Sequence, residues 1–249
     1  MRYKKFPPAA ELEPFVECYF VWEGEASERT EIQSAPNCFG AIVFNYGDAY
    51  QAFQNSSSLQ SVPKAFACGL FTSNYHLVMK GTIGIFGIVP KASALHNFFL
   101  FPMSNLVNSR MPLKFLLGAM ANQLWNEIKV QTSDESRNDI LERFALSHLA
   151  EARSRLSVID DAVEFIDEKK GCVSVDAVAE YLGIIRRYLE KKFLEKVSVS
   201  SKFYAQIKRF GILSNHIAHH EKIDWQELVF EYGFHDQSHL VKEFMKSTR

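Results

Sequence analysis

A degenerate repeat after residue 174 constrains what this chain can fold into more than any other feature. Two apolar stripes share the helical spacing i, i+3, i+4 and i+7 and lie 50 residues apart: Val175, Val178, Ala179 and Leu182, and Trp225, Leu228, Val229 and Tyr232. A glycine and then an apolar pair at spacing i, i+4 follow each stripe: Gly183 with Leu189 and Phe193, and Gly233 with Leu240 and Phe244. A short helix, a glycine-containing turn and a second helix form a helix-turn-helix. The repeat therefore predicts two such units, with one extra residue in the second turn.

The second helix of the first unit carries a local excess of positive charge. Residues 186–209 contain eight Lys or Arg and two Glu, a net charge of +6 in a chain whose formal net charge is -1. With the apolar pair buried, Arg187, Glu190 and Lys191 lie together on the opposite face of the helix. Arginine and lysine pair with guanine and glutamate accepts from cytosine, so this face is suited to reading bases in a major groove. A solvated helix face that binds nothing has the same composition, and the residues alone leave that alternative open.

The second unit offers its own set of outward-facing side chains. Asp236 is expected to cap the second helix of this unit, with the apolar pair facing inward. The residues expected to face outward are Gln237, Ser238, His239 and Lys242. Contacts to phosphate would position such units without reading sequence. By location alone, the candidates for those contacts are Arg186, Lys192, Lys202, Lys208 and Lys246.

The first half of the chain has a different periodicity. From about Phe15 to Val89, apolar residues come in short β-branched and aromatic runs separated by Gly, Pro, Ser and Asn: FVECYFVW, FGAIVFNYG and GTIGIFGIV. This pattern predicts an antiparallel β-rich region. Its aromatic residues are expected to form an ordinary core, and the alternative is that they line a ligand pocket.

Helical spacing begins after Pro90 and continues to the end of the chain. Helical patterns at 91–101, 113–124 and 133–152 predict three helices before the repeat. Polar residues interrupt the pattern near 153–158, where we place a boundary. The chain is thus predicted to be an α+β protein, with a β-rich domain that ends in helices at 1–154 and an all-α double helix-turn-helix domain at 155–249.

Both C-terminal repeats resemble the paired helix-turn-helix motifs of the AraC/XylS transcriptional regulators. The matching segments are VDAVAEYLGIIRRYLEKKF with VSVSSKFYAQIKR, and WQELVFEYGFHDQSHLVKEF. The N-terminal half resembles the β-rich sensory domain of a subset of these regulators. It does so through FxPxxxLxPFVxxYF at 6–20 and PNCFGAIVFNYGD at 36–48.

This resemblance implies a sequence-specific, DNA-binding transcriptional regulator rather than an enzyme. It assigns base contacts to Arg187, Glu190 and Lys191, with Arg186 beside them in the first unit. The implied partner is double-stranded DNA, and no cofactor is implied. RNA polymerase, a small-molecule effector and a second copy of the chain in a homodimer are partners that the resemblance leaves open.

The chain departs from the family pattern at several places. Ile185 stands where the family usually has a serine cap, Ser198 and Ser201 replace a glycine and a proline, and Gln206 replaces a basic residue. The sequence ends at Arg249 without the closing G-x-x-P-x-x-Y segment, so we expect the apolar pair of the second unit to be incompletely covered. These departures motivate an alternative function, a ligand-binding or protein-interaction module with a degenerated DNA reader.

Other classes of protein find little support in the sequence. The four cysteines never form a C-x-x-C pair, and the histidine sets near the second unit lack the Glu or Cys of a zinc site. The H-x-H triad of a cupin enzyme is absent, as are G-x-S-x-G, a phosphate loop and G-x-G-x-x-G. The N-terminus lacks the apolar segment of a signal peptide, and no run approaches the 18 apolar residues of a membrane span. We therefore expect a cytoplasmic protein without a membrane or metal partner.

Overall fold

A computed structural model of the chain describes residues 1–249 except 37–39, 55–56, 220–222, 239 and 242–249. At 218, 219 and 227 it describes the backbone but not the side chain. The described strands form one antiparallel sheet in the order β1-β2-β7-β3-β6-β8, with β4 joined to β7 and β5 to β4. Their bounds are β1 Arg2–Phe6, β2 Val16–Ser34, β3 Ala41–Asn45, β4 Gln51–Gln54, β5 Gln60–Ser61, β6 Ala65–Cys68, β7 Tyr75–Pro90 and β8 Arg110–Pro112. The predicted antiparallel β-rich region is confirmed.

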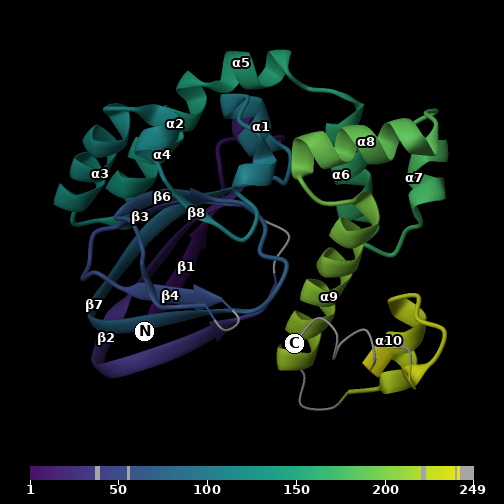
Figure 1. Ribbon diagram of the computed structural model, residues 1–249, viewed down its shortest axis with the longest axis horizontal. Coiled ribbons are helices and arrows are strands. Elements are labelled where there is room, and N and C mark those ends of the chain that lie inside the picture. Colours follow the sequence, from purple (N-terminus) through teal and green to yellow (C-terminus); the bar gives the residue numbers. More distant parts are fainter. Residues whose placement is uncertain (37–39, 55–56, 220–222, 239, 242–249) are drawn as a thin grey trace.

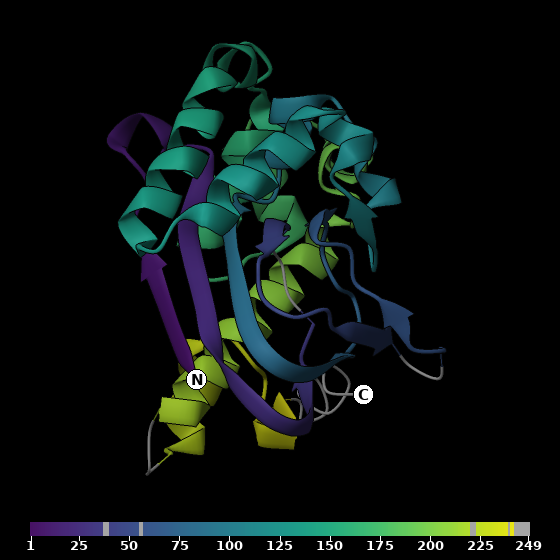
Figure 2. The same ribbon diagram turned by 90° about the vertical axis from the view of Figure 1, so that its left-hand side faces the viewer.

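The two longest strands, β2 and β7, run side by side and curve together (Figure 2). Their register shifts between Ala26 and Thr30, opposite Gly81, whose φ of 85° lies in the left-handed region. A β-bulge of this kind increases the local twist and bends the strands. The bend lets β7 pair with β3 near one end and with β4 near the other.

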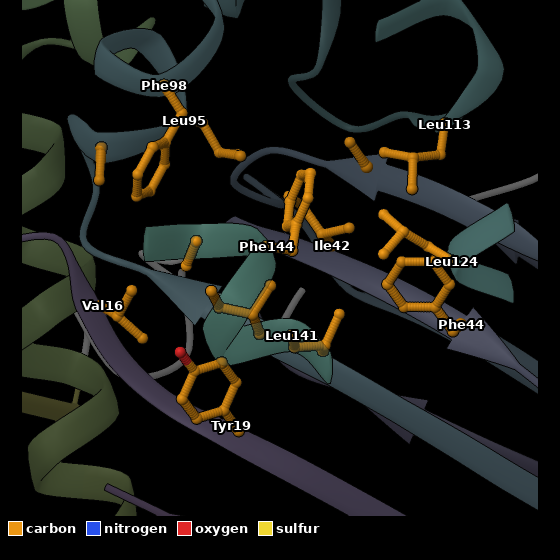
Figure 3. Packing of buried hydrophobic residues seen from close by; sticks show 14 of the residues in the cluster. Val16, Tyr19, Ile42, Phe44, Leu95, Phe98, Leu113, Leu124, Leu141 and Phe144 are labelled. Atoms are coloured by element: carbon orange, nitrogen blue, oxygen red, sulfur yellow. The ribbon is translucent and has the colours of Figure 1, made fainter. Parts of the chain in front are cut away.

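The sheet separates two apolar cores because alternate residues of each strand face opposite sides. On one side, Phe86 and Ile88 of β7 pack with residues of the helices that follow the sheet. Figure 3 shows this contact, with Tyr19, Ile42 and Phe44 of the strands facing buried side chains of those helices. On the other side, Ile83 and Ile85 belong to a separate cluster inside the curve of the sheet. Aromatic residues of the strand runs, among them Phe15, Tyr19, Phe44 and Phe86, are thus core residues.

The helices that precede residue 155 cover one side of the sheet (Figure 1). Their bounds are η1 Ala10–Leu12, α1 Ala94–Phe99, η2 Met103–Asn105, α2 Lys114–Leu117, α3 Met120–Val130, α4 Asp134–Ser147 and α5 Leu149–Ser154. Three expectations for this region were wrong in detail. The helix expected at 113–124 ends at Gly118, whose φ of 56° is left-handed, and a new helix begins after it. The helix expected at 133–152 is interrupted at His148, and β8 lies in a region expected to be helical.

The remaining described helices are α6 Val158–Glu168, α7 Val175–Tyr181, α8 Arg186–Val197, α9 Ser201–His219 and α10 Trp225–Glu231. A capping box, in which the side chains of Ser157 and Asp160 each bond the other's backbone, starts α6. Three of these helices, α6 to α8, pack around the first part of α9, which then runs down beside the sheet toward α10 (Figure 1).

Candidate nucleic-acid interface

The two repeats have the same backbone geometry at the turn. Gly183 has a φ of 64° and Gly233 a φ of 65°. In each copy the residue after the glycine donates its backbone N–H to a carbonyl five residues back, Ile184 to Ala179 at 3.0 Å and Phe234 to Val229 at 2.9 Å. A Cβ added to either glycine would meet no atom within 4 Å, so the left-handed backbone itself is what favours glycine there.

The turns differ in length, as the offset of the apolar pairs predicts. In the first copy the N–H of Leu189 bonds to the carbonyl of Ile185, two residues after the glycine. In the second copy the N–H of Leu240 bonds to the carbonyl of Asp236, three residues after the glycine. We call α7 and α8 the first helix pair. The second helix pair consists of α10 and the helical residues at 237, 238, 240 and 241.

Helix α8 buries one face and exposes the other. Leu189 and Phe193 are fully buried, and the ring of Phe193 lies 5.7 Å from that of Tyr204 in α9. Arg187 and Lys191 are exposed on the opposite side, and neither forms an ion pair with any residue that the structure describes. The two cations are therefore available to a ligand.

Arg186 and Glu190 are already paired. The guanidinium of Arg186 contacts Glu190 at 3.1 Å and Asp176 of α7 at 3.0 Å, and these bonds raise the pKa of Arg186. All three side chains are exposed, so the pairs contribute little to stability. They do hold Arg186 and Glu190 in one arrangement across the start of α8.

Helix α8 starts without a side-chain cap. Its N-cap residue, Ile185, makes no capping hydrogen bond and is 72% exposed. The expected departure from the family pattern at this position is thus present in the structure. The first turn also lacks an acidic residue, whose negative charge would interact favourably with the helix dipole.

In the second helix pair, Gln237 and Ser238 are exposed as predicted. Leu240 is only 1% exposed, so the expectation that it is incompletely covered was wrong. It packs in a cluster with Leu213 of α9 and with Leu228 and Tyr232 of the pair. His239 and Lys242 lie outside the described residues, as do Phe244 and Lys246.

The basic residues proposed for phosphate contact fall in different surroundings. Lys192 pairs with Glu195 at 2.7 Å, and Lys208 pairs with Asp167 at 3.0 Å. Lys202 lines a groove of about 460 Å³ together with Arg186 and Arg209. The groove touches both helix pairs, since Ser174, Val175 and Gly233 also line it.

The sequence did not predict a polar junction beneath α8. The ammonium of Lys196 is buried and contacts the carboxylate of Asp160 in α6 at 2.5 Å. The other oxygen of that carboxylate accepts hydrogen bonds from Ser93 and Asn97 at 2.7 Å, at the start of α1 and within it. Burial raises the pKa of Asp160, but the bonds from Lys196, Ser93 and Asn97 outweigh this effect and lower it. The spacing of Ser157 and Asp160 in the sequence, typical of a capping box, could have pointed to this region.

A cavity of about 300 Å³ lies between α9 and the strands β1, β2 and β7. Lys5, Lys91 and Lys208 supply positive charge, and Glu17 and Asp167 supply negative charge. The apolar part of the lining comes from residues on both sides: Val89, Pro90, Ala92, Tyr204, Ile207 and Ile212. Because these residues are far apart in the sequence, no local pattern pointed to the cavity.

Among the residues that the structure describes, no three His, Cys, Asp or Glu side chains come together to hold a metal ion. None of the described helices is long and apolar enough to cross a membrane.

Comparison with known proteins adds little about function. No curated protein matches this chain. A family model described as a domain of unknown function, DUF6597, matches residues 4–112. Among solved structures, the chain is similar to ToxT from Vibrio cholerae at 12% identity, covering 100% of this chain and 95% of ToxT with a TM-score of 0.48.

Two further solved structures show weaker similarity. Wild-type ToxT from Vibrio cholerae strain SCE256 with a bound unsaturated fatty acid is 13% identical, covers 92% of this chain and 90% of its own, and gives a TM-score of 0.44. The AraC-like transcriptional activator CuxR is 13% identical, and the match covers 86% of this chain and 94% of CuxR with a TM-score of 0.31. Similarities this low carry no conclusion about what this chain binds.

Proposed function

We propose that this chain is a sequence-specific, DNA-binding transcriptional regulator of the AraC/XylS type. One observation carries the proposal. A helix, a left-handed glycine turn and a second helix occur twice at an offset of 50 residues, and the exposed face of α8 presents two cations that have no ion-pair partner among the described residues. The motif resemblance at Tyr232-Gly233-Phe234 and Asp236-Gln237-Ser238 supports the same function.

In this proposal, residues 155–249 read DNA through both helix pairs. Arg187 and Lys191 contact base edges, and Glu190 reads a neighbouring base from the position that Arg186 sets. Gln237, Ser238, His239 and Lys242 read the second segment. Helix α9 has 19 residues and, at about 1.5 Å per residue, spans about 28 Å. This length is close to the roughly 34 Å between successive major-groove segments on one face of a duplex.

Residues 1–154 act as the sensory domain in this proposal. The cavity between the sheet and α9 is the best-placed site for a small-molecule effector, because its walls come from both domains. The lining carries three lysines against two carboxylates, and Lys208 is already paired with Asp167, so the cavity favours a mainly apolar ligand with at most one negative charge. A ligand bound in this cavity would change how α9 packs against the sheet and would thereby shift the two helix pairs that read DNA. Homodimer formation and contact with RNA polymerase stay predictions.

The proposal is tested by selecting bound sequences from a random pool of duplex DNA. We expect enrichment of a bipartite motif whose two segments lie about one helical turn apart. Affinity for the selected duplex should exceed that for random duplex by about 10³-fold or more and should fall as salt rises. Equal affinity for both duplexes at every salt concentration would contradict sequence-specific reading.

A further inference from the structure

Helix α9 belongs to two different apolar cores. Its first part contributes Phe203, Tyr204 and Ala205 to the cluster that also contains the first helix pair. Its last part contributes Ile212, Leu213 and Ile217 to the cluster that contains the second helix pair. The change from one core to the other falls between residues 205 and 212.

The first helix pair is also fixed to the sheet-bearing part of the chain. Leu70 and Ala92, which precede α1, are buried in the same cluster as α6, α7 and α8. The carboxylate of Asp160 joins Ser93 and Asn97 to Lys196 of α8. We call this group the Asp160 junction, and it includes Arg155, whose guanidinium bonds the carbonyls of Asn97 and Phe98 at 2.8 and 2.9 Å.

The core of the second helix pair contains no described residue from the first 171 positions. Exposed and half-buried side chains of the segment before α7 and of α9 contact the second helix pair and the turn within it. Lys170 contacts Glu231 at 3.3 Å. Arg209 lies over the ring of Phe234 at 4.4 Å and bonds the carbonyl of Tyr232 at 3.4 Å.

Gly211 lies in α9 where the two cores meet. Glycine is among the least favourable residues in a helix interior, because it leaves the backbone more freedom than any other residue. At many buried positions close packing explains a helical glycine, but a Cβ at Gly211 would meet no atom within 4 Å. Gly211 is exposed and also lines the cavity between α9 and the sheet.

We propose that Gly211 is a hinge that lets the second helix pair swing, while the Asp160 junction holds the first helix pair against the sheet. Gly211, Ser93 and Asn97 are then positioning residues for DNA reading, and none of them touches DNA. This inference rests on the proposed function for its purpose. A ligand in the adjacent cavity would restrict the hinge by contact with Tyr204, Ile207 and Ile212.

The hinge is tested by pulsed electron spin distance measurements on the full chain without DNA. Spin labels on unnatural amino acids replace exposed residues, namely Gln123 in α3, Glu180 in α7 and Gln226 in α10. We expect a narrow distance distribution for the 123–180 pair and a clearly broader one for the 180–226 pair. Equal widths for the two pairs would overturn the proposal.

Three variants sharpen the test. Gly211→Ala should narrow the 180–226 distribution to about the width of the 123–180 pair. Ser214→Ala, three residues further along α9, favours helix without removing a glycine and should leave both widths unchanged. Ser93→Ala with Asn97→Ala should broaden only the 123–180 distribution, and if that variant does not fold, Arg155→Ala takes its place. No narrowing in Gly211→Ala would overturn the hinge.

A binding measurement connects the hinge to reading. A duplex with one base pair inserted between the two segments of the selected motif changes the spacing that the helix pairs must span. On this duplex Gly211→Ala should lose more affinity than the wild-type chain, because its second helix pair cannot move to the new position. Equal losses would show that the hinge has no part in reading. The distances need no DNA, so a chain that selects no motif would refute the proposed function and leave the hinge measurable.

Discussion

At the scale of single residues, the basic face of α8 consists of two kinds of cation. Arg187 and Lys191 have no described ion-pair partner, whereas Arg186 is held by Asp176 and Glu190. An unpaired cation gains its full interaction when it binds a base or phosphate. A paired one must first exchange its partner, so its net contribution is smaller.

We therefore predict that Arg187→Ala and Lys191→Ala each weaken binding to the selected duplex by about 1–3 kcal/mol and relax the preference at one base pair. Arg186→Ala should cost less, because the wild-type side chain is already paired. Fluorescence anisotropy titrations on the selected and random duplexes measure these effects. Arg153→Ala, an exposed cation in α5, is the matched control and should change neither affinity. Equal losses on both duplexes would mean that Arg187 and Lys191 touch phosphate only.

A second prediction at this scale concerns His96 in α1. Burial lowers the pKa of His96 below 6.5, although its bond to the carbonyl of Phe101 opposes the change. Of the charged groups nearby, Lys196 and Arg155 also lower this pKa and Asp160 raises it. Between the folded pKa and 6.5, the unfolded chain binds more protons than the folded chain. The free energy of unfolding should therefore fall as the pH decreases through 6.5 toward the folded pKa.

Denaturant unfolding at several pH values measures this dependence. His96→Asn removes the titrating ring and should flatten the slope of unfolding free energy against pH over that range. The Asp160 carboxylate, with its lowered pKa, should matter only at more acidic pH, where protonation breaks its bonds to Lys196, Ser93 and Asn97. An unchanged slope in His96→Asn would assign the effect to another group.

At the scale of elements, α8 is a helix whose position is set by packing rather than by its own start signal. The side chain of Ile185 forms no cap, yet Leu189, Phe193 and Val197 are fully buried on α7, α6 and α9. The burial of such side chains is worth more than a cap, at about 1.5–3 kcal/mol each against about 1 kcal/mol. A helix can thus form in place without a local capping signal.

This comparison predicts that Ile185→Ser stabilises the chain. The exposed isoleucine loses little apolar burial, and the serine hydroxyl can accept a hydrogen bond from the free backbone N–H groups of the first turn. The free energy of unfolding should rise by about 1 kcal/mol in chemical denaturation. Ile185→Ala serves as the control, since it shortens the side chain without supplying a cap. The same result for both variants would show that the hydroxyl does not cap α8.

At the scale of the whole molecule, residues 1–154 contain two complete apolar clusters, one on each side of the sheet. Leu70 and Ala92 belong instead to the cluster around α8, and Ser93 and Asn97 bond to Asp160. The proposed boundary near residues 153–158 therefore leaves both clusters of the sheet intact, but it cuts buried contacts at Leu70, Ala92, Ser93 and Asn97.

We predict that a fragment of residues 1–154 is soluble and unfolds cooperatively, because it retains both clusters and has an ordinary domain size. Its midpoint should lie below that of the corresponding transition in the full chain, since the fragment exposes Leu70 and Ala92. Calorimetry of both proteins measures this difference. Aggregation of the fragment under conditions that keep the full chain soluble would show that the two parts share one core.

What the sequence by itself determined is local. The helices α7 and α10, the glycine turn after each of them and the exposed face of α8 all follow from spacings of a few residues, and the described residues have these features. The strand pattern similarly indicated the antiparallel sheet. The breaks at Gly118 and His148 were missed because an apolar stripe continues across them, and only the backbone conformation ends the helix there.

Only the tertiary structure decided how these elements work together. The pair of Asp160 with Lys196, the bond of Asn97 to that carboxylate, and the cavity beside Gly211 all join residues tens of positions apart. The burial of Leu240 was decided in the same way, by Leu213 and Tyr232. Periodicity reports which face of an element is apolar, but it carries no information about which other element covers that face. That choice depends on the packing of the whole chain.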